Sequence, residues 1–168
     1  IILADAYQDI TVPFHMATKE FFQIVKDHLK PGGILIVNVN MKSGSFTGVP
    51  EYLANTVKSM FNKVYRADLS QVTNSLLFIS DDNDMLENYK NNTLAQINED
   101  HDLYLISKYI DNNLVEMTDD TLILTDDLAP VELLGQKALS EIVNAEVEGV
   151  RSMIEGKSLK EIIEYFTE

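Results

Sequence analysis

The sequence PGGILIVNVN at residues 31–40 decides the fold of this chain. Its Pro-Gly-Gly start ends any helix that precedes it, because proline and glycine disfavour a helix interior. Residues 34–37 are then apolar without interruption, and the run ends in the polar sequence Asn-Val-Asn at 38–40. Short apolar runs of this kind are typical of strands buried on both faces, as in parallel sheets.

A second apolar run, Ile-Ile-Leu-Ala, stands at residues 1–4. Between the two runs, Thr18 can cap a helix whose apolar residues recur at helical spacing. These residues are Phe21, Phe22, Ile24, Val25, His28 and Leu29. A strand, a helix and a strand in this order predict a β-α-β unit, with parallel strands joined by a right-handed crossover. A strand buried on both faces needs neighbours, so we expect further strands upstream of residue 1.

Downstream, Pro50 suits the first turn of a second helix, whose buried stripe contains Leu53, Val57, Met60 and Phe61. Two strand-like runs follow at 64–67 and 75–79, and the short turn between them predicts an antiparallel pair. The order β-α-β-α-β-β indicates an α/β fold, a doubly wound Rossmann-like sheet that finishes on an antiparallel edge. We assign residues 1–80 to this sheet domain.

Residues 81–168 differ in composition from the residues before them, and we expect them to form an acidic, mainly helical C-terminal extension. Helical runs are predicted at 86–97 and 103–109. A longer helix follows, in which Leu139, Val143, Val147, Val150 and Ile154 share one face. Gly156 ends that helix, and the sequence SLKE at 158–161 reads as a capping box for a last one.

The composition excludes several classes of function. The chain has 13 Lys and Arg against 27 Asp and Glu, a formal charge of −14. Nucleic acid is therefore not an expected partner, because its binding depends on Lys and Arg neutralising phosphates. A small cationic substrate such as an amine is compatible with this charge. There is no cysteine, and no apolar stretch is long enough to span a membrane, so we expect a cytoplasmic protein without disulfides or thiolate chemistry.

The carboxyl ends of parallel strands are where open α/β sheets bind ligands. Asp5, Ala6, Tyr7 and Gln8 follow the first strand. Asp5 is the sharpest candidate, because a carboxylate at a partly dry cleft can anchor or deprotonate an amine. The alternative is that Asp5 caps the loop by accepting nearby backbone N–H groups. Tyr7 could stack on an adenine or cover the amine, or pack within its loop.

Other polar residues have weaker claims. Asp126 and Asp127, in the sequence LTDD, could bind a cationic substrate or could cap the helix that begins near Pro130. His15 could line the site or pack on the following helix. His28 and His101 are interpreted as structural and solvated, respectively. The three histidines lack the spacing of metal ligands, so no metal site is predicted.

The run ADAYQDITVPFHMATKEFFQIVKDHLKPGGILIVNV, together with LTDDLAPVE, resembles the second half of a spermidine synthase-like protein. That group, the polyamine aminopropyltransferases and their relatives, has the class I S-adenosylmethionine-dependent methyltransferase fold. The resemblance covers residues 1–80 and the LTDD segment. It implies that the chain begins at the fourth of seven strands, and that the main cofactor-binding segments lie upstream of residue 1.

Carried over by position, Asp5 matches the aspartate that orients and deprotonates the attacking amine in the aminopropyltransferases. Gln8 stands where those enzymes usually have a second aspartate, which puts polyamine specificity in question. The resemblance implies Asp5, Ala6 and Tyr7 as contacts of the cofactor, S-adenosylmethionine or its decarboxylated form. It implies Tyr7, Gln8, His15, Asp126 and Asp127 as contacts of the substrate.

The function expected from this resemblance is a spermidine synthase-like transferase of polyamine biosynthesis. Two alternatives stay open. One is a methyltransferase that uses S-adenosylmethionine itself. The other is a non-catalytic half-domain that acts by association, since exposed apolar strand edges favour pairing. For the same reason we expect a homo-oligomer, or association with an N-terminal half.

Overall fold

The computed structural model describes residues 1–6, 13–39, 49–69, 74–118 and 123–157. Its centre is a mixed sheet with the strand order β1-β2-β4-β3-β5. The strands are β1 (Ile2–Ala4), β2 (Leu35–Val39), β3 (Lys63–Asp68), β4 (Ser75–Ser80) and β5 (Leu114–Glu116). The helices around it are η1 (Phe14–Met16), α1 (Lys19–His28), α2 (Val49–Lys58), α3 (Met85–Tyr89), η2 (Lys90–Leu94), α4 (Asp102–Asn113) and α5 (Val131–Ile154). The predicted α/β class is therefore confirmed.

The β-α-β unit is present as predicted. β1 pairs in parallel with β2, with Ala4 opposite Val37. Thr18 caps α1, since its Oγ1 accepts a hydrogen bond from the amide of Phe21 at 3.3 Å. After α1 the chain turns at Gly32, whose φ of +70° favours glycine because a side chain would be strained there. The helix stop and the start of the strand thus both lie in the Pro-Gly-Gly sequence.

The sheet ends on an antiparallel strand beside β3, as predicted, but that strand is β5, and β4 of the predicted hairpin lies inside the sheet. β4 pairs with β3, as the short turn predicts, but its other side pairs with β2. The crossover through α2 places β3 one strand position away from β2, and β4 returns to fill that gap. The outer edge beside β3 is formed by β5, which the sequence did not predict.

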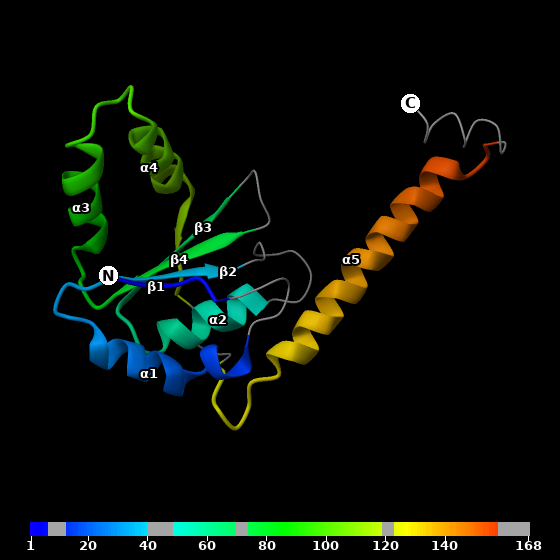
Figure 1. The fold of residues 1–168 in the computed structure, drawn as a ribbon, viewed down its shortest axis with the longest axis horizontal. Helices are drawn as coiled ribbons and strands as arrows, with labels where there is room; N and C mark the ends of the chain where they lie inside the picture. The colour runs from blue at the N-terminus through cyan, green and yellow to red at the C-terminus, as the bar shows by residue number, and fades with distance from the viewer. Residues whose placement is uncertain (7–12, 40–48, 70–73, 119–122, 158–168) are drawn as a thin grey trace.

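The two faces of the sheet are covered unequally. Figure 1 shows α1 and α2 on one face of the sheet, with α3 and α4 on the other. In β2, the helix-facing side chains of Leu35, Val37 and Val39 are fully buried, whereas Ile36 is only partly buried. Burial of the strand on both faces, as predicted from its apolar run, is therefore wrong for the described part of the chain. Leu3 in β1 is 66% exposed.

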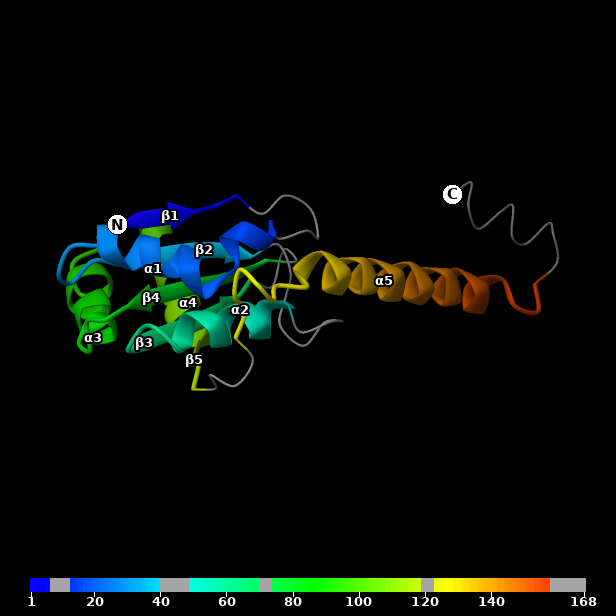
Figure 2. The same ribbon diagram turned by 90° about the horizontal axis from the view of Figure 1, so that it is seen from below.

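Residues beyond 80 take part in the same core. β5 extends the sheet, and Leu124 and Val131 are buried among the side chains beneath α1 and α2. Beyond this anchor α5 projects away from the sheet (Figures 1 and 2). Several of its apolar side chains are exposed: Leu133, Val143, Val147, Val150 and Met153. The last predicted helix, at 158–161, lies outside the described residues. None of the described helices is long and apolar enough to cross a membrane.

Thr56 joins this late segment to α2. Its hydroxyl accepts a buried hydrogen bond from the amide of Leu124 at 2.9 Å and donates one to the carbonyl of Tyr52 at 2.7 Å. Thr56→Val keeps the shape but leaves the Leu124 amide buried without its acceptor. We expect a loss of about 1–3 kcal/mol in the free energy of unfolding, measured by chemical denaturation.

Thr56→Ser, which keeps the hydroxyl, should lose less stability than Thr56→Val. Ser140→Ala is the matched control, because the Ser140 hydroxyl bonds to Gln136 on the exposed surface of α5. Equal stability of Thr56→Val and the unmodified protein would contradict this role of Thr56.

Candidate functional site

Asp5 follows the carboxyl end of β1, and Asn38 lies at the same end of the neighbouring parallel strand β2. The register that sets Ala4 opposite Val37 brings these two side chains together. The Asn38 Nδ2 donates a hydrogen bond to the Asp5 Oδ1 at 2.8 Å. Asp5 is exposed and Asn38 is half-buried. The structure thus places a carboxylate at the sheet edge where the sequence predicts ligand binding, with one of its oxygens held by an amide.

Asn74 adds a third side chain to this cluster. It directly precedes β4, and its Nδ2 donates to the Asn38 Oδ1 at 2.9 Å. The sequence analysis did not identify Asn74. It stands in a polar turn far along the chain, and only the insertion of β4 beside β2 brings it to Asn38. We call Asp5, Asn38 and Asn74 the edge cluster.

Three other predicted residues belong to the same segment of chain. Ala6 is exposed directly beside Asp5. Tyr7 and Gln8 lie outside the described residues, so their predicted contacts with cofactor and amine stay predictions. Asn40, at the end of the second strand signal, also lies outside them.

Asp126 and Asp127 form the tip of a tight turn. Thr125 and Leu128 exchange backbone hydrogen bonds on either side of them, at 3.2 and 2.9 Å. The turn is tied to the start of α1, because the carbonyl of Leu124 accepts from the amide of Lys19 at 2.8 Å. Both aspartates are exposed. In the described residues no hydrogen bond or ion pair links either of them to the edge cluster.

The alternative of helix capping by these aspartates is not seen either. α5 begins at Val131 with Pro130 in the capping position, and no side chain makes a capping hydrogen bond there. Instead, the amide of Asp126 donates to the Glu20 Oε2 at 3.0 Å. The LTDD turn is thus held by α1 through its backbone, with both carboxylates left at the surface.

The histidines have local partners. His15 is exposed in η1, and its ring stands edge-on to that of Phe14, with 5.4 Å between centroids. The His28 Nδ1 lies 2.7 Å from the carbonyl of Ile24, within α1. The His101 Nδ1 accepts from the amide of Leu103 at the start of α4. Among the described residues, no group of three or more acidic or histidine side chains could hold a metal ion.

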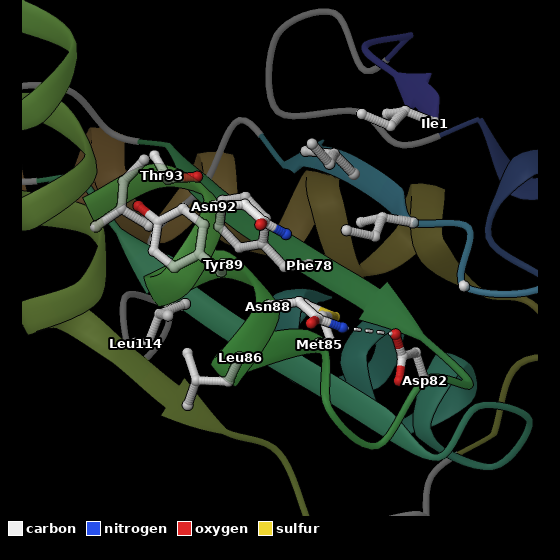
Figure 3. A pocket seen from close by; sticks show the side chains of 14 residues that line it. Ile1, Phe78, Asp82, Met85, Leu86, Asn88, Tyr89, Asn92, Thr93 and Leu114 are labelled. Carbon is white, nitrogen blue, oxygen red and sulfur yellow. Dashed lines mark hydrogen bonds between the residues drawn. The ribbon is translucent and has the colours of Figure 1, made fainter. Parts of the chain in front are cut away.

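A cavity of about 550 Å³ lies elsewhere, on the open face of the sheet (Figure 3). Its sheet wall includes Ile34, Ile36 and Phe78, and Tyr89 approaches from α3. Burial raises the pKa of the Tyr89 phenol above its usual value, and the hydroxyl donates to the carbonyl of Ser107 at 2.7 Å. The edge cluster does not line this cavity, which is mostly apolar. Position and chemistry therefore favour the edge cluster as the site of a reaction.

Fold and site together define a class of protein: an α/β protein with an acidic side chain at the carboxyl ends of its parallel strands. No protein-family model matches the chain. It is similar to a protein of Bifidobacterium longum (strain NCC 2705) named "Probable polyamine aminopropyl transferase", with 36% identity over 92% of this chain. The chain spans 38% of the length of that relative. The predicted resemblance to the polyamine aminopropyltransferases is thereby confirmed.

The hydrogen bond from the Asp126 amide to Glu20 generates a test of the LTDD turn. In Glu20→Ala the charged acceptor is lost, so the amide of Asp126 should exchange with solvent about tenfold faster. Hydrogen exchange followed by NMR measures this. Asp27→Ala removes another exposed carboxylate of α1, one that accepts from Gln23, and should leave the Asp126 amide unchanged. Unaltered exchange in Glu20→Ala would show that the turn does not depend on this contact.

Proposed function

We propose that this chain is the amine-binding part of a polyamine aminopropyltransferase. The similarity to a probable polyamine aminopropyl transferase over 92% of the chain carries the proposal. The edge cluster supports it, because it supplies a carboxylate at the strand end to which the sequence resemblance assigns the amine. The acidic character of the chain, with its charge of −14, also suits a cationic substrate.

The fold assignment that accompanies this proposal is a Rossmann-like, methyltransferase-type sheet. The strand order β1-β2-β4-β3, with one parallel pair and an inserted antiparallel strand, is compatible with the second half of such a sheet. The carboxyl ends of β1 and β2 would then face the ligands. Asp5 and Ala6 are the described residues that we place next to them.

In the proposed reaction, Asp5 prepares the amine for attack. Its Oδ1 is engaged by Asn38, and we assign the Oδ2, which has no partner among the described residues, to an amine N–H. Decarboxylated S-adenosylmethionine would supply a methylene carbon activated by the adjoining sulfonium. As the amine nitrogen bonds to this carbon, the carbon–sulfur bond breaks and its electron pair stays on sulfur. Asp5 takes the proton that the nitrogen gives up, as a general base does.

The described residues fit the amine better than the nucleoside. The exposed Asp5 carboxylate, whose Oδ2 bonds to no other residue that the structure describes, can accept from an ammonium or amine group, whereas Ala6 offers the nucleoside only backbone and a methyl group. We therefore assign this chain the amine and the proton transfer. Decarboxylated S-adenosylmethionine, rather than S-adenosylmethionine, is the proposed cosubstrate because the relative is named an aminopropyl transferase.

A second candidate role is association through the edge of the sheet that β1 forms. Ile1 and Leu3 are 90% and 66% exposed, and in the described chain β1 has a hydrogen-bonded neighbour on one side only. An apolar strand edge of this kind favours pairing with another chain. This role is compatible with catalysis, and it would persist if the chain were catalytically inactive.

Asp5→Asn tests the catalytic role. The substitution keeps the size of the side chain but removes its charge and basicity, so kcat for an amine acceptor should fall by about 10²–10⁴. Aminopropyl transfer by the complete gene product, measured by mass spectrometry of the product amine, gives this rate. The melting temperature should barely change, because Asp5 is exposed and the strand end stays polar.

Asp27→Asn is the matched control, since it makes the same change at an exposed position of α1. It should keep the activity of the unmodified protein. If Asp5 only caps its loop, Asp5→Ala will instead lower stability by about 0.5–2 kcal/mol and leave the turnover of folded molecules unchanged.

Leu3→Lys tests the association. The unmodified chain should be a dimer or larger by light scattering, because the apolar edge of β1 is open. A lysine at this position should shift the chain toward the monomer, since charged side chains protect edge strands from pairing. Leu105→Lys, at a comparably exposed leucine of α4, should leave the mass unchanged. A monomeric unmodified chain would rule out this mode of association.

A further inference from the structure

The edge cluster is a chain of two hydrogen bonds that runs across neighbouring strands. Asn74 donates to the Asn38 Oδ1 at 2.9 Å, and Asn38 donates to the Asp5 Oδ1 at 2.8 Å. The three side chains come from the segment after β1, from β2 itself and from the residue before β4. In both hydrogen bonds the donor is the side chain farther from Asp5, so the chain of donors and acceptors ends on the Asp5 carboxylate.

This direction is set from both ends, by Asn74 and by Asp5. A primary amide has an oxygen that only accepts and an NH₂ group that only donates. Because the NH₂ group of Asn74 occupies the oxygen of Asn38, the NH₂ group of Asn38 faces Asp5. In the reverse orientation, the Asn38 oxygen would face the carboxylate and repel it. Asp5, which only accepts, and Asn74, which donates, therefore both select the same orientation of the Asn38 amide.

Asn74 is itself held at the base of the β3–β4 turn. Its carbonyl accepts from the amide of Leu69 at 2.9 Å. The next residue, Ser75, is fully buried, pairs with Val39 across β2 and donates its hydroxyl to Asp68 at 2.6 Å. The position of Asn74 is thus fixed by backbone contacts on both sides of the turn, independently of Asp5.

We propose that Asn38 and Asn74 are positioning residues for aminopropyl transfer, which fix the Asp5 carboxylate with its Oδ2 directed to the amine. This role rests on the proposed function. Asn38 acts on Asp5 directly, and Asn74 acts through Asn38. Without Asn74 the Asn38 amide is held by Asp5 alone, so the contact that orients the carboxylate becomes less rigid. Small losses of alignment at a reacting group cost as much as about a hundredfold in rate.

The hydrogen-bonded chain is tested first, without any assay of activity. Hydrogen exchange of the Asn38 side-chain amide is followed by NMR in the complete gene product. In Asn74→Ala this exchange should become about tenfold faster, because the Asn38 amide is then held by Asp5 alone. In Asn113→Asp it should stay as in the unmodified protein, since the Asn113 side chain bonds to Tyr109 within α4. Unchanged exchange in Asn74→Ala overturns the proposal.

The second test measures catalysis. Asn74→Ala should lower kcat by about 10- to 100-fold, with KM for decarboxylated S-adenosylmethionine unchanged. Asn74→Asp should lower kcat further, because a carboxylate there attracts the NH₂ group of Asn38 and turns its oxygen toward Asp5. Asn113→Asp introduces the same charge elsewhere and should keep full activity. An unchanged kcat in both Asn74→Ala and Asn74→Asp overturns the positioning role.

The decisive measurement is the double variant. If Asn74 acts through Asp5, then adding Asn74→Ala to Asp5→Asn should change kcat by less than about twofold. Losses that multiply would mean that Asn74 acts independently of Asp5, and would overturn this proposal while leaving the proposed function intact. An inactive unmodified gene product would overturn both, and it is recognised before any variant is made.

Discussion

The position of β4 is the constraint on which the rest of this structure depends. β4 pairs with β3 over Ser75–Ser80 and with β2 over Ser75–Ile79, so it closes the gap that the crossover through α2 leaves in the sheet. Its Leu77 and Ile79 are fully buried beneath the helices beside Leu35 and Val37 of β2. The same pairing brings Asn74 to Asn38. One strand placement thus fixes both this part of the core and the third member of the edge cluster.

Local signals in the sequence are sufficient for the elements around β2. Continuous apolar runs, the Thr18 cap and the Pro-Gly-Gly stop each act within a few residues, and the structure contains the strand–helix–strand unit that they predict. The insertion of β4 depends on pairing between segments about forty residues apart, which no local pattern encodes. β5 is three residues long and half exposed, so its sequence has no alternation to reveal it. An apolar run also cannot tell whether one face of a strand is covered by the chain itself, as Ile36 shows.

In the candidate site, too, some residues could be predicted from local sequence and others could not. Asp5 could be identified because it stands directly after a strand, and Asn38 because it ends the next one. Their contact follows from parallel pairing in register. Asn74 required the tertiary structure. For Asp126 and Asp127, the family resemblance suggested contacts with a cationic substrate, which stay a prediction. The structure shows that their turn is held by α1 through backbone groups and through Glu20. Acidic side chains at a surface turn look the same in sequence whether or not they bind a ligand.

The projection of α5 has a consequence for how this protein can change over evolutionary time. Val131 is 1% exposed and belongs to the core, whereas Leu133, two residues later, is 67% exposed. Leu134 still packs against the core, and beyond it none of the described side chains of the helix belongs to the core. Substitutions along its outer length can therefore accumulate without unfolding the molecule. Natural selection can alter what this arm contacts while Asp5 and its amide partners remain under separate constraint.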